Sequence, residues 1–190
     1  MLVPLAVPLR IDEAKDFATS RNLIFIETFV PRFINIDVAL DTLLKAYVPM
    51  TLNDQVRRAT ATTNPLHEQT QETVEATFKV VIIGDENMES IKKGIMTTLT
   101  SSKIEFGTRL IHHDRKIIKA ILLNTSGQER NRNSVSICSR DAAVALLVFN
   151  VRERTTFERC KIWVERLRLI NSHIAVILIA VDTDTSDIKM

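Results

Sequence analysis

The chain has 190 residues and a formal net charge of +2, with 45% hydrophobic and 25% charged residues. This length suits one α/β domain better than two, and the composition is that of an ordinary globular protein. The small net charge argues against a nucleic-acid-binding protein.

The first predicted elements are a helix, a strand and a second helix. Acidic residues near its start and an apolar stripe predict a short helix over residues 12–20. The continuous apolar run over residues 23–26 predicts a strand buried on both faces. Apolar residues at helical spacing after Asn35, a favourable N-cap residue, predict a helix that Pro49 ends.

Residues 49–77 are rich in Thr, Gln, Asn and Glu and lack aliphatic periodicity, which predicts a polar linker. After this linker, predicted strands and helices alternate. The strands cover residues 78–83, 103–112, 116–123, 142–151 and 174–181, and the helices cover residues 91–99 and 156–169. The second and third of these strands form a predicted hairpin. The pattern predicts a three-layer α/β fold, with a mostly parallel sheet and helices on both faces.

The sequence also bears on the compartment. The longest apolar run, residues 174–181, has the length of one strand and falls short of a membrane span. The N-terminal stretch contains two prolines and no charged start, so it is a poor signal peptide. Cys138 and Cys160 lack metal-ligand spacing and the density of a disulfide framework. We therefore expect an intracellular, cytoplasmic protein with no metal site formed by these residues.

Two segments carry motifs where open α/β sheets bind ligands, beyond the carboxyl ends of strands. Residues 78–85 read FKVVIIGD and residues 123–130 read LNTSGQER. They resemble the phosphate-loop strand and the Asp-Thr-Ala-Gly-Gln-Glu-Arg segment of the Rab family of small GTPases. The resemblance implies a P-loop small-GTPase-like fold, a place in vesicle-mediated transport, GTP hydrolysis as the family activity, and GTP or GDP with Mg²⁺ as ligands.

The resemblance occurs in a permuted order. Residues 1–48 resemble the C-terminal third of a Rab domain, and residues 78–190 resemble its first two thirds. Together they supply about one complete set of strands and helices. We expect one combined, circularly permuted α/β domain, with the junction of two tandem copies as the alternative. A third interpretation is a rearranged gene product with no evolved function.

The phosphate loop departs from the family pattern G-x-x-x-x-G-K-[ST], in which backbone N–H groups, the lysine and the hydroxyl bind phosphates and Mg²⁺. Residues 84–91 read GDENMESI, so Gly84 and Asp85 are retained. The last three positions of the pattern are occupied by Glu89, Ser90 and Ile91. Lys92 and Lys93 follow, and rotation along the predicted helix leads us to expect that both point away from the loop.

The remaining nucleotide motifs are also incomplete. The resemblance gives Asn124 the position of the aspartate that holds Mg²⁺ through water, and it gives Gly127 and Gln128 their family positions. In the family this glutamine orients the attacking water. Without Mg²⁺ and the loop lysine we expect Gln128 to be vestigial.

The guanine-reading pattern Asn-Lys-x-Asp appears as VDTD in residues 181–184, which retains only Asp184. Thr28 lies at the family position of the supporting Glu-Thr-Ser-Ala-Lys loop, where Pro31 removes a backbone donor. The segment between residues 99 and 103, which corresponds to the first switch, is too short to wrap around a nucleotide.

Rab effectors commonly bind three aromatic residues, and the corresponding positions here are Phe106, Leu123 and Cys138. We expect trafficking proteins to bind this surface, if any partner does, and we expect no lipid anchor because the chain ends without a prenylation motif. The predicted function is a pseudo-GTPase that acts as a binding module. The alternative is a weak GTP-binding switch with slow hydrolysis.

Overall fold

The structure is a computed structural model that describes residues 9–29, 32–45, 74–100, 106–113, 116–125 and 132–183. The helices are α1 (Ile11–Ser20), a helix over residues 36–45, the short 3-10 helix η1 (Glu86–Met88), α3 (Glu89–Thr100), α4 (Arg132–Ser139) and α5 (Arg154–Ile170). The strands are β1 (Ile24–Phe29), β2 (Val74–Gly84), β3 (Phe106–His113), β4 (Lys116–Asn124), β5 (Ala142–Asn150) and β6 (Ala175–Asp182).

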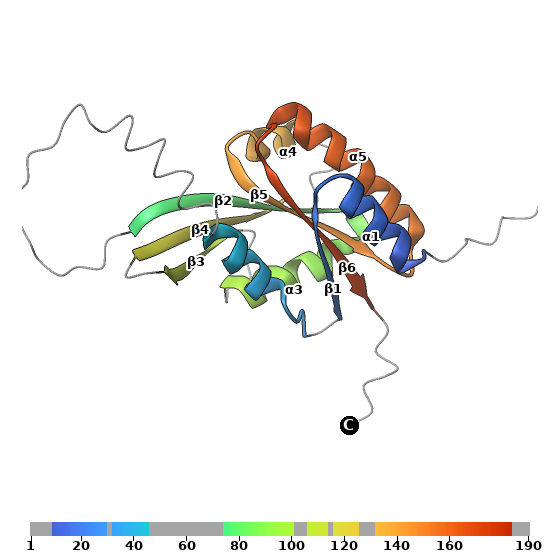
Figure 1. Cartoon of the computed structure of the whole chain (residues 1–190), viewed down its shortest axis with the longest axis horizontal. Coiled ribbons are helices and arrows are strands. Elements are labelled where there is room, and N and C mark those ends of the chain that lie inside the picture. Colours follow the sequence, from blue (N-terminus) through green and yellow to red (C-terminus); the bar gives the residue numbers. More distant parts are fainter. Residues whose placement is uncertain are drawn as a thin grey trace, which may run out of the picture.

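The six strands of the described residues form one sheet in the order β1-β6-β5-β2-β4-β3 (Figure 1). Each neighbouring pair is parallel except β3 and β4, which form the antiparallel hairpin that the sequence predicts. The fold is therefore the predicted α/β fold with a mostly parallel sheet.

Helices cover both faces of this sheet (Figure 1). On one face lie α1, α4 and α5, and the side of α5 that the sequence predicts to face inward is buried, including Phe157 and Trp163. On the other face lie α3 and the helix over residues 36–45, with Ile95 and Leu40 in the core. Successive strand residues point to opposite faces, so the central strands β5 and β6 are apolar on both sides.

The structure corrects the prediction for β1. The sequence predicts a strand over residues 23–26 that is buried on both faces, but Ile24 is 39% exposed and Phe25 is only partly buried. This strand lies at the edge of the sheet and pairs only with β6 among the described strands. A continuous apolar run occurs in central strands and in this edge strand alike, and only the strand order distinguishes them.

Two further elements differ from the sequence prediction. β2 begins at Val74 instead of residue 78, because Val74 and Ala76 pair with Ile117 and Ile118 of β4. The sequence did not predict α4, which is only 8 residues long and mostly polar around Val135. Residues 49–73 of the predicted linker lie outside the described residues.

Residues 9–29 and 32–45 contact the rest of the described chain on both faces of the sheet. Phe33 is 5% exposed, and a methyl group added at Gly94 of α3 would lie 2.5 Å from its ring. Arg109 of β3 donates hydrogen bonds to both carboxylate oxygens of Asp41, at 2.8 and 3.0 Å. On the opposite face, Arg154 of α5 donates to Glu13 of α1 at 2.6 Å. We use the term seam for this set of contacts.

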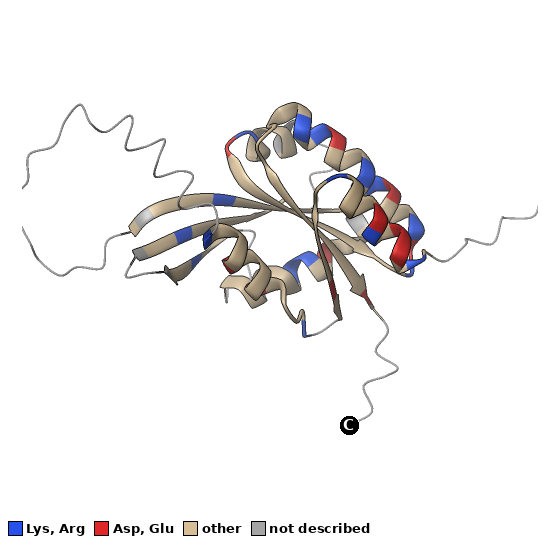
Figure 2. Cartoon of the chain, in the orientation of Figure 1, with Lys and Arg blue, Asp and Glu red and all other residues tan. Residues whose placement is uncertain are grey.

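Charged residues are frequent on α1 and α5, where both acidic and basic positions occur (Figure 2). Among the described residues, ion pairs join α1 and its C-cap residue to α5: Glu13 pairs with Arg154 and Lys161, and Arg21 pairs with Glu165. Among the residues that the structure describes, no helix is long and apolar enough to cross a membrane.

Candidate functional site at the carboxyl edge of the sheet

The carboxyl ends of the parallel strands meet at one edge of the sheet, where ligands of such folds bind. β2 ends at Gly84 and β4 ends at Asn124. Thr28 of β1 lies beside Val181 of β6 in the strand register. Of the predicted site residues, this edge carries Gly84, Asp85, Asn124 and Thr28, whereas Gly127, Gln128 and Asp184 lie outside the described residues.

In the loop that follows β2, the side chains of Met88 and Lys92 pack closely around Gly84. A methyl group added at Gly84 would lie 3.0 Å from the carbonyl oxygen of Val148, 3.4 Å from Cβ of Met88 and 3.5 Å from Cδ of Lys92. Met88, in η1, is only 1% exposed. Side-chain carbons of Met88 and Lys92 therefore occupy the space above Gly84.

The structure contradicts the expected orientation of Lys92. Its side chain is 1% exposed, and its Nζ donates to the carbonyl oxygen of Gly84 at 3.4 Å. Long side chains on helices point back toward the helix N-terminus, and Lys92 lies in the first turn of α3. The expectation was wrong because it considered rotation about the helix axis and neglected this backward reach. Lys93 does remain exposed.

The carboxylate of Glu89 is enclosed at the start of α3. Both of its oxygens are buried and have no hydrogen-bond partner in the described part of the chain. The ammonium groups of Lys92 and Lys93 lie at ion-pair distances of 3.5 and 3.4 Å from it, but neither contact has hydrogen-bond geometry. The two lysines thus offset the charge of Glu89 without satisfying its oxygens.

Arg159 of α5 and Glu153, the residue that precedes α5, form hydrogen bonds with the loop that follows β2. Arg159 donates to the buried carboxylate of Asp85, and Asn87 donates to Glu153 at 3.2 Å. The partners are 74 and 66 residues apart in sequence. Sequence reasoning missed Arg159 and Glu153, because only the placement of β5 beside β2 brings α5 to the loop.

Asn124, at the predicted Mg²⁺-binding position, is 6% exposed. Neither its amide nitrogen nor its amide oxygen has a hydrogen-bond partner among the described residues. The next residue, Thr125, is tied to β2 by a 2.8 Å hydrogen bond from its hydroxyl to the carbonyl oxygen of Ile82. In the described parts of the chain, no group of three or more His, Cys, Asp or Glu side chains is placed to hold a metal ion.

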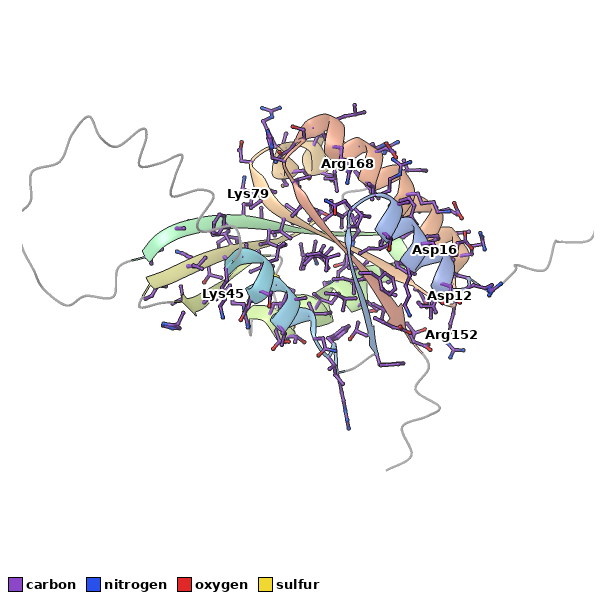
Figure 3. All side chains as sticks on the ribbon, viewed as in Figure 1. Asp12, Asp16, Lys45, Lys79, Arg152 and Arg168 are labelled. Atoms are coloured by element: carbon purple, nitrogen blue, oxygen red, sulfur yellow. The ribbon has the colours of Figure 1, made fainter. Side chains whose placement is uncertain are left out.

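The carboxyl ends of β1 and β6, where the sequence predicts the remnant of a guanine-reading pattern, make a different set of contacts. Val181 is fully buried, and Arg152 donates to the carboxylate of Asp182 at 2.7 Å. Figure 3 shows Arg152 near the carboxyl end of β6, far from Arg168 toward the other end of α5. The hydroxyl of Thr28 is buried with no hydrogen-bond partner in the described residues.

The predicted partner surface is only partly apolar and exposed. Phe106 is 48% exposed and pairs with Leu123 across the β3–β4 hairpin. Leu123 of β4 and Cys138 of α4 are partly buried and pack against the hydrophobic core on that face of the sheet. The structure therefore places Phe106 beside Leu123.

Comparison of the sequence with known proteins identifies the family of this chain. The model of the Ras family matches residues 79–190, which is more than half of the chain. The chain belongs to the Ras family. This Ras-family chain is 40% identical over 101 residues to Ras-related protein RABA1f of Arabidopsis thaliana, which covers 48% of the chain and 46% of that relative. It is also 34% identical over 123 residues to Ras-related protein YPTC6 of Chlamydomonas reinhardtii, covering 59% of the chain and 56% of the relative.

A third relative, Ras-related protein Rab11D of Lotus japonicus, is 35% identical over 118 residues, covering 56% of the chain and 53% of the relative. The Ras-family chain therefore spans about half the length of the curated relatives that it matches. The similarity to Rab proteins inferred from the motifs is confirmed at this level.

Proposed function

We propose that this chain is a single, circularly permuted Rab-like domain that no longer binds guanine nucleotide and acts as a nucleotide-independent binding module in intracellular membrane traffic. The Rab similarity supports the cellular setting. The observation that carries the proposed loss is the filled phosphate loop, in which Met88 and Lys92 occupy the space above Gly84.

The loop residues do not fit a nucleoside triphosphate. Backbone N–H groups bind phosphates only when they face an open cradle, and negative charge nearby opposes the ligand. Here the carboxylate of Glu89 is enclosed at the start of α3, and Ser90 stands where the family pattern has its lysine. We therefore derive no reaction step through GTP.

The other two parts of the site support the same proposal. Asn124 supplies a neutral amide at the position where a carboxylate would favour Mg²⁺. At the base-reading end, Val181 is apolar and buried, and Asp182 is engaged by Arg152. Neither arrangement favours binding of a guanine base or of the metal.

The seam supports the proposal of one permuted domain. β1, which resembles a C-terminal Rab strand, pairs in parallel with β6, which resembles a strand from the first two thirds. The contacts of Phe33, Asp41 and Glu13 add both apolar packing and ion pairs to this strand pairing. In a tandem-copy junction, by contrast, the two parts would belong to different domains.

Limited trypsin digestion tests the single domain. We expect early cleavage at Arg57 and Arg58, which lie in the predicted linker, and we expect the two products to remain associated on gel filtration. Rapid loss of either product, or its separate elution, would contradict a single permuted domain and favour the two alternative interpretations of the rearrangement.

As the binding surface we propose the area around Phe106, Leu123 and Cys138. Phe106 supplies exposed aromatic area beside Leu123 on the hairpin, and aromatic side chains are enriched at interaction sites. We propose trafficking proteins as partners, by similarity with the Rab family. The substitution Phe106→Ala tests this, because it removes exposed aromatic area from an edge strand without opening the core.

Nucleotide binding tests the central proposal. We expect purified protein to contain no bound GDP or GTP, and fluorescent GDP titrated with Mg²⁺ to give no saturable signal at concentrations up to about 100 μM. A dissociation constant of about 1 μM or tighter would contradict the proposal.

A second candidate function is a weak GTP-binding switch with slow hydrolysis. One observation favours it: the ammonium of Lys92 reaches the loop although Ser90 occupies the expected lysine position. This candidate predicts Mg²⁺-dependent GTP hydrolysis that Gln128→Leu abolishes. Equal rates in the parent and the variant would exclude it.

A further inference from the structure

We infer that Lys92 is an internal ligand of the phosphate loop: its side chain fills the loop and its ammonium group closes it, so that the loop keeps its shape without nucleotide. This inference rests on the proposed loss of nucleotide binding and names the contact that maintains the closed loop. It concerns a residue outside the family phosphate-loop pattern.

The aliphatic stem of Lys92 supplies the first part of the argument. Cδ of Lys92 lies 3.5 Å from the position of a methyl group added at Gly84, and Met88 borders the same point at 3.4 Å. These carbons therefore lie at van der Waals distance from the position of that methyl group and pack against Gly84. Lys92 is fully buried, and it is the charged residue among the largest fully buried side chains that the structure describes.

The ammonium group supplies the second part. A buried ammonium is costly unless it is paired and hydrogen-bonded. Lys92 has both kinds of partner, with Nζ at 3.4 Å from the Gly84 carbonyl oxygen and at 3.5 Å from Oε2 of Glu89. The carbonyl oxygen belongs to the end of β2 and the carboxylate to the first turn of α3. Lys92 thus links the two ends of the loop.

The charges around Lys92 explain why Glu89 is tolerated in a phosphate loop. Glu89 would repel a phosphate, but the same carboxylate stabilises an ammonium enclosed beside it. The matched residue for comparison is Lys93, whose ammonium lies 3.4 Å from Oε1 of Glu89 while its side chain is 57% exposed. Both lysines contact one carboxylate, and only Lys92 reaches the interior of the loop.

A double-mutant cycle tests this internal ligand with Lys92→Met, Glu89→Gln and the double variant. Methionine retains the apolar stem and removes the ammonium. We expect Glu89→Gln to lower the midpoint of thermal unfolding by about 6–12 °C in the parent, because it leaves Lys92 buried without its charge partner. In the Lys92→Met background, where the ammonium is already absent, Glu89→Gln should lower the midpoint by less than about half of the shift seen in the parent. Equal shifts in both backgrounds would overturn the inference.

Hydrogen exchange gives a local readout that global stability does not supply. We expect Lys92→Met to increase amide exchange at least about 10-fold in a peptide covering residues 84–93, with little change in a peptide from β6. Lys93→Met should leave exchange in both peptides unchanged. If Lys92→Met does not increase exchange in the loop, Lys92 does not hold it closed.

Titration of the parent and of Lys92→Met with GTP and with inorganic phosphate separates this inference from the proposed function. Tight GTP binding by the parent would contradict the proposed function, and a closed loop would then be excluded as well. Absence of GTP binding together with unchanged exchange in Lys92→Met would contradict only the internal ligand.

Discussion

The seam and the carboxyl edge of the sheet differ in how their partly or fully buried polar groups are paired. At the seam, Asp41 and Glu13 accept hydrogen bonds from arginines at 2.6 to 3.0 Å. At the carboxyl edge, polar atoms of Glu89, Asn124 and Thr28 are buried with no hydrogen-bond partner among the described residues. Unpaired buried polar groups cost stability. The paired groups at the seam therefore stabilise the fold, whereas the amide of Asn124 and the hydroxyl of Thr28 at the edge are retained at a cost.

Within the seam, the largest expected effect is at its apolar part. On an open helix, Gly→Ala stabilises by about 1 kcal/mol. At Gly94 the added methyl group would lie 2.5 Å from the ring of Phe33, so we expect Gly94→Ala to destabilise the chain by about 1–3 kcal/mol. Chemical denaturation measures this change.

Two control variants accompany Gly94→Ala. Thr98→Ala, at an exposed position of the same helix, should change the free energy of unfolding by less than about 0.5 kcal/mol. Combining Gly94→Ala with Phe33→Ala should cost less than the sum of the single changes, because the clash is removed. Additive costs would show that Phe33 does not pack on Gly94 in solution.

The next largest effect is expected at the ion pair of Arg109 and Asp41, whose side chains are 23% and 25% exposed. A double-mutant cycle with Arg109→Met and Asp41→Asn should give a coupling energy of about 1–2 kcal/mol, because the contact is bidentate and partly buried. A coupling energy near zero would exclude a contribution of this pair to the seam.

The pKa of Arg109 adds a pH test to that cycle. The hydrogen bond to Asp41 raises the pKa of Arg109 above its usual value, although burial opposes the shift. A raised pKa gives stability that is present below the pKa of the unfolded state and is lost only as pH rises through the pKa of the folded state. Both values lie far above neutrality, so the contribution of Arg109 should not change between about pH 7 and about pH 9.

A smaller effect of opposite sign is expected at the carboxyl edge. Asn124→Leu replaces an unpaired buried amide by an apolar group of similar size, so we expect stability to stay equal or to rise by up to about 1 kcal/mol. The control is Asn171→Leu, because Asn171 donates to the carbonyl oxygen of Ala142 at 2.9 Å. We expect the control to destabilise by about 1 kcal/mol. Destabilisation by both variants would indicate that the Asn124 amide has a function in folding.

The smallest expected effect is that of nucleotide on thermal stability. A ligand at 100 times its dissociation constant stabilises by about 2.7 kcal/mol, which corresponds to several degrees. We expect 1 mM GTP with Mg²⁺, a concentration about 1,000 times a micromolar dissociation constant, to leave the unfolding midpoint unchanged. A rise of several degrees in the unfolding midpoint would show that the carboxyl edge still binds nucleotide. The unpaired polar groups at this edge would then have a ligand, unlike the internally paired groups of the seam.

The sequence by itself determined the parts of the molecule that depend on local pattern. Apolar runs fixed the central strands, and helical periodicity fixed the buried side of α5 at Phe157, Cys160 and Trp163. The motif letters at residues 78–85 and 123–130 indicated a Rab-like small GTPase, and the Ras-family model matches residues 79–190. These features repeat over short distances, so a single sequence is sufficient to recognise them.

The tertiary structure decided what depends on the neighbours of each element. The strand order made β1 an exposed edge, although its apolar run is like that of a central strand. The same order brought Arg159 to Asp85 across 74 residues of chain. The backward reach of a long side chain placed the ammonium of Lys92 against Gly84. Sequence spacing cannot give such contacts, because they depend on how strands are ordered and on which way each side chain leaves its helix.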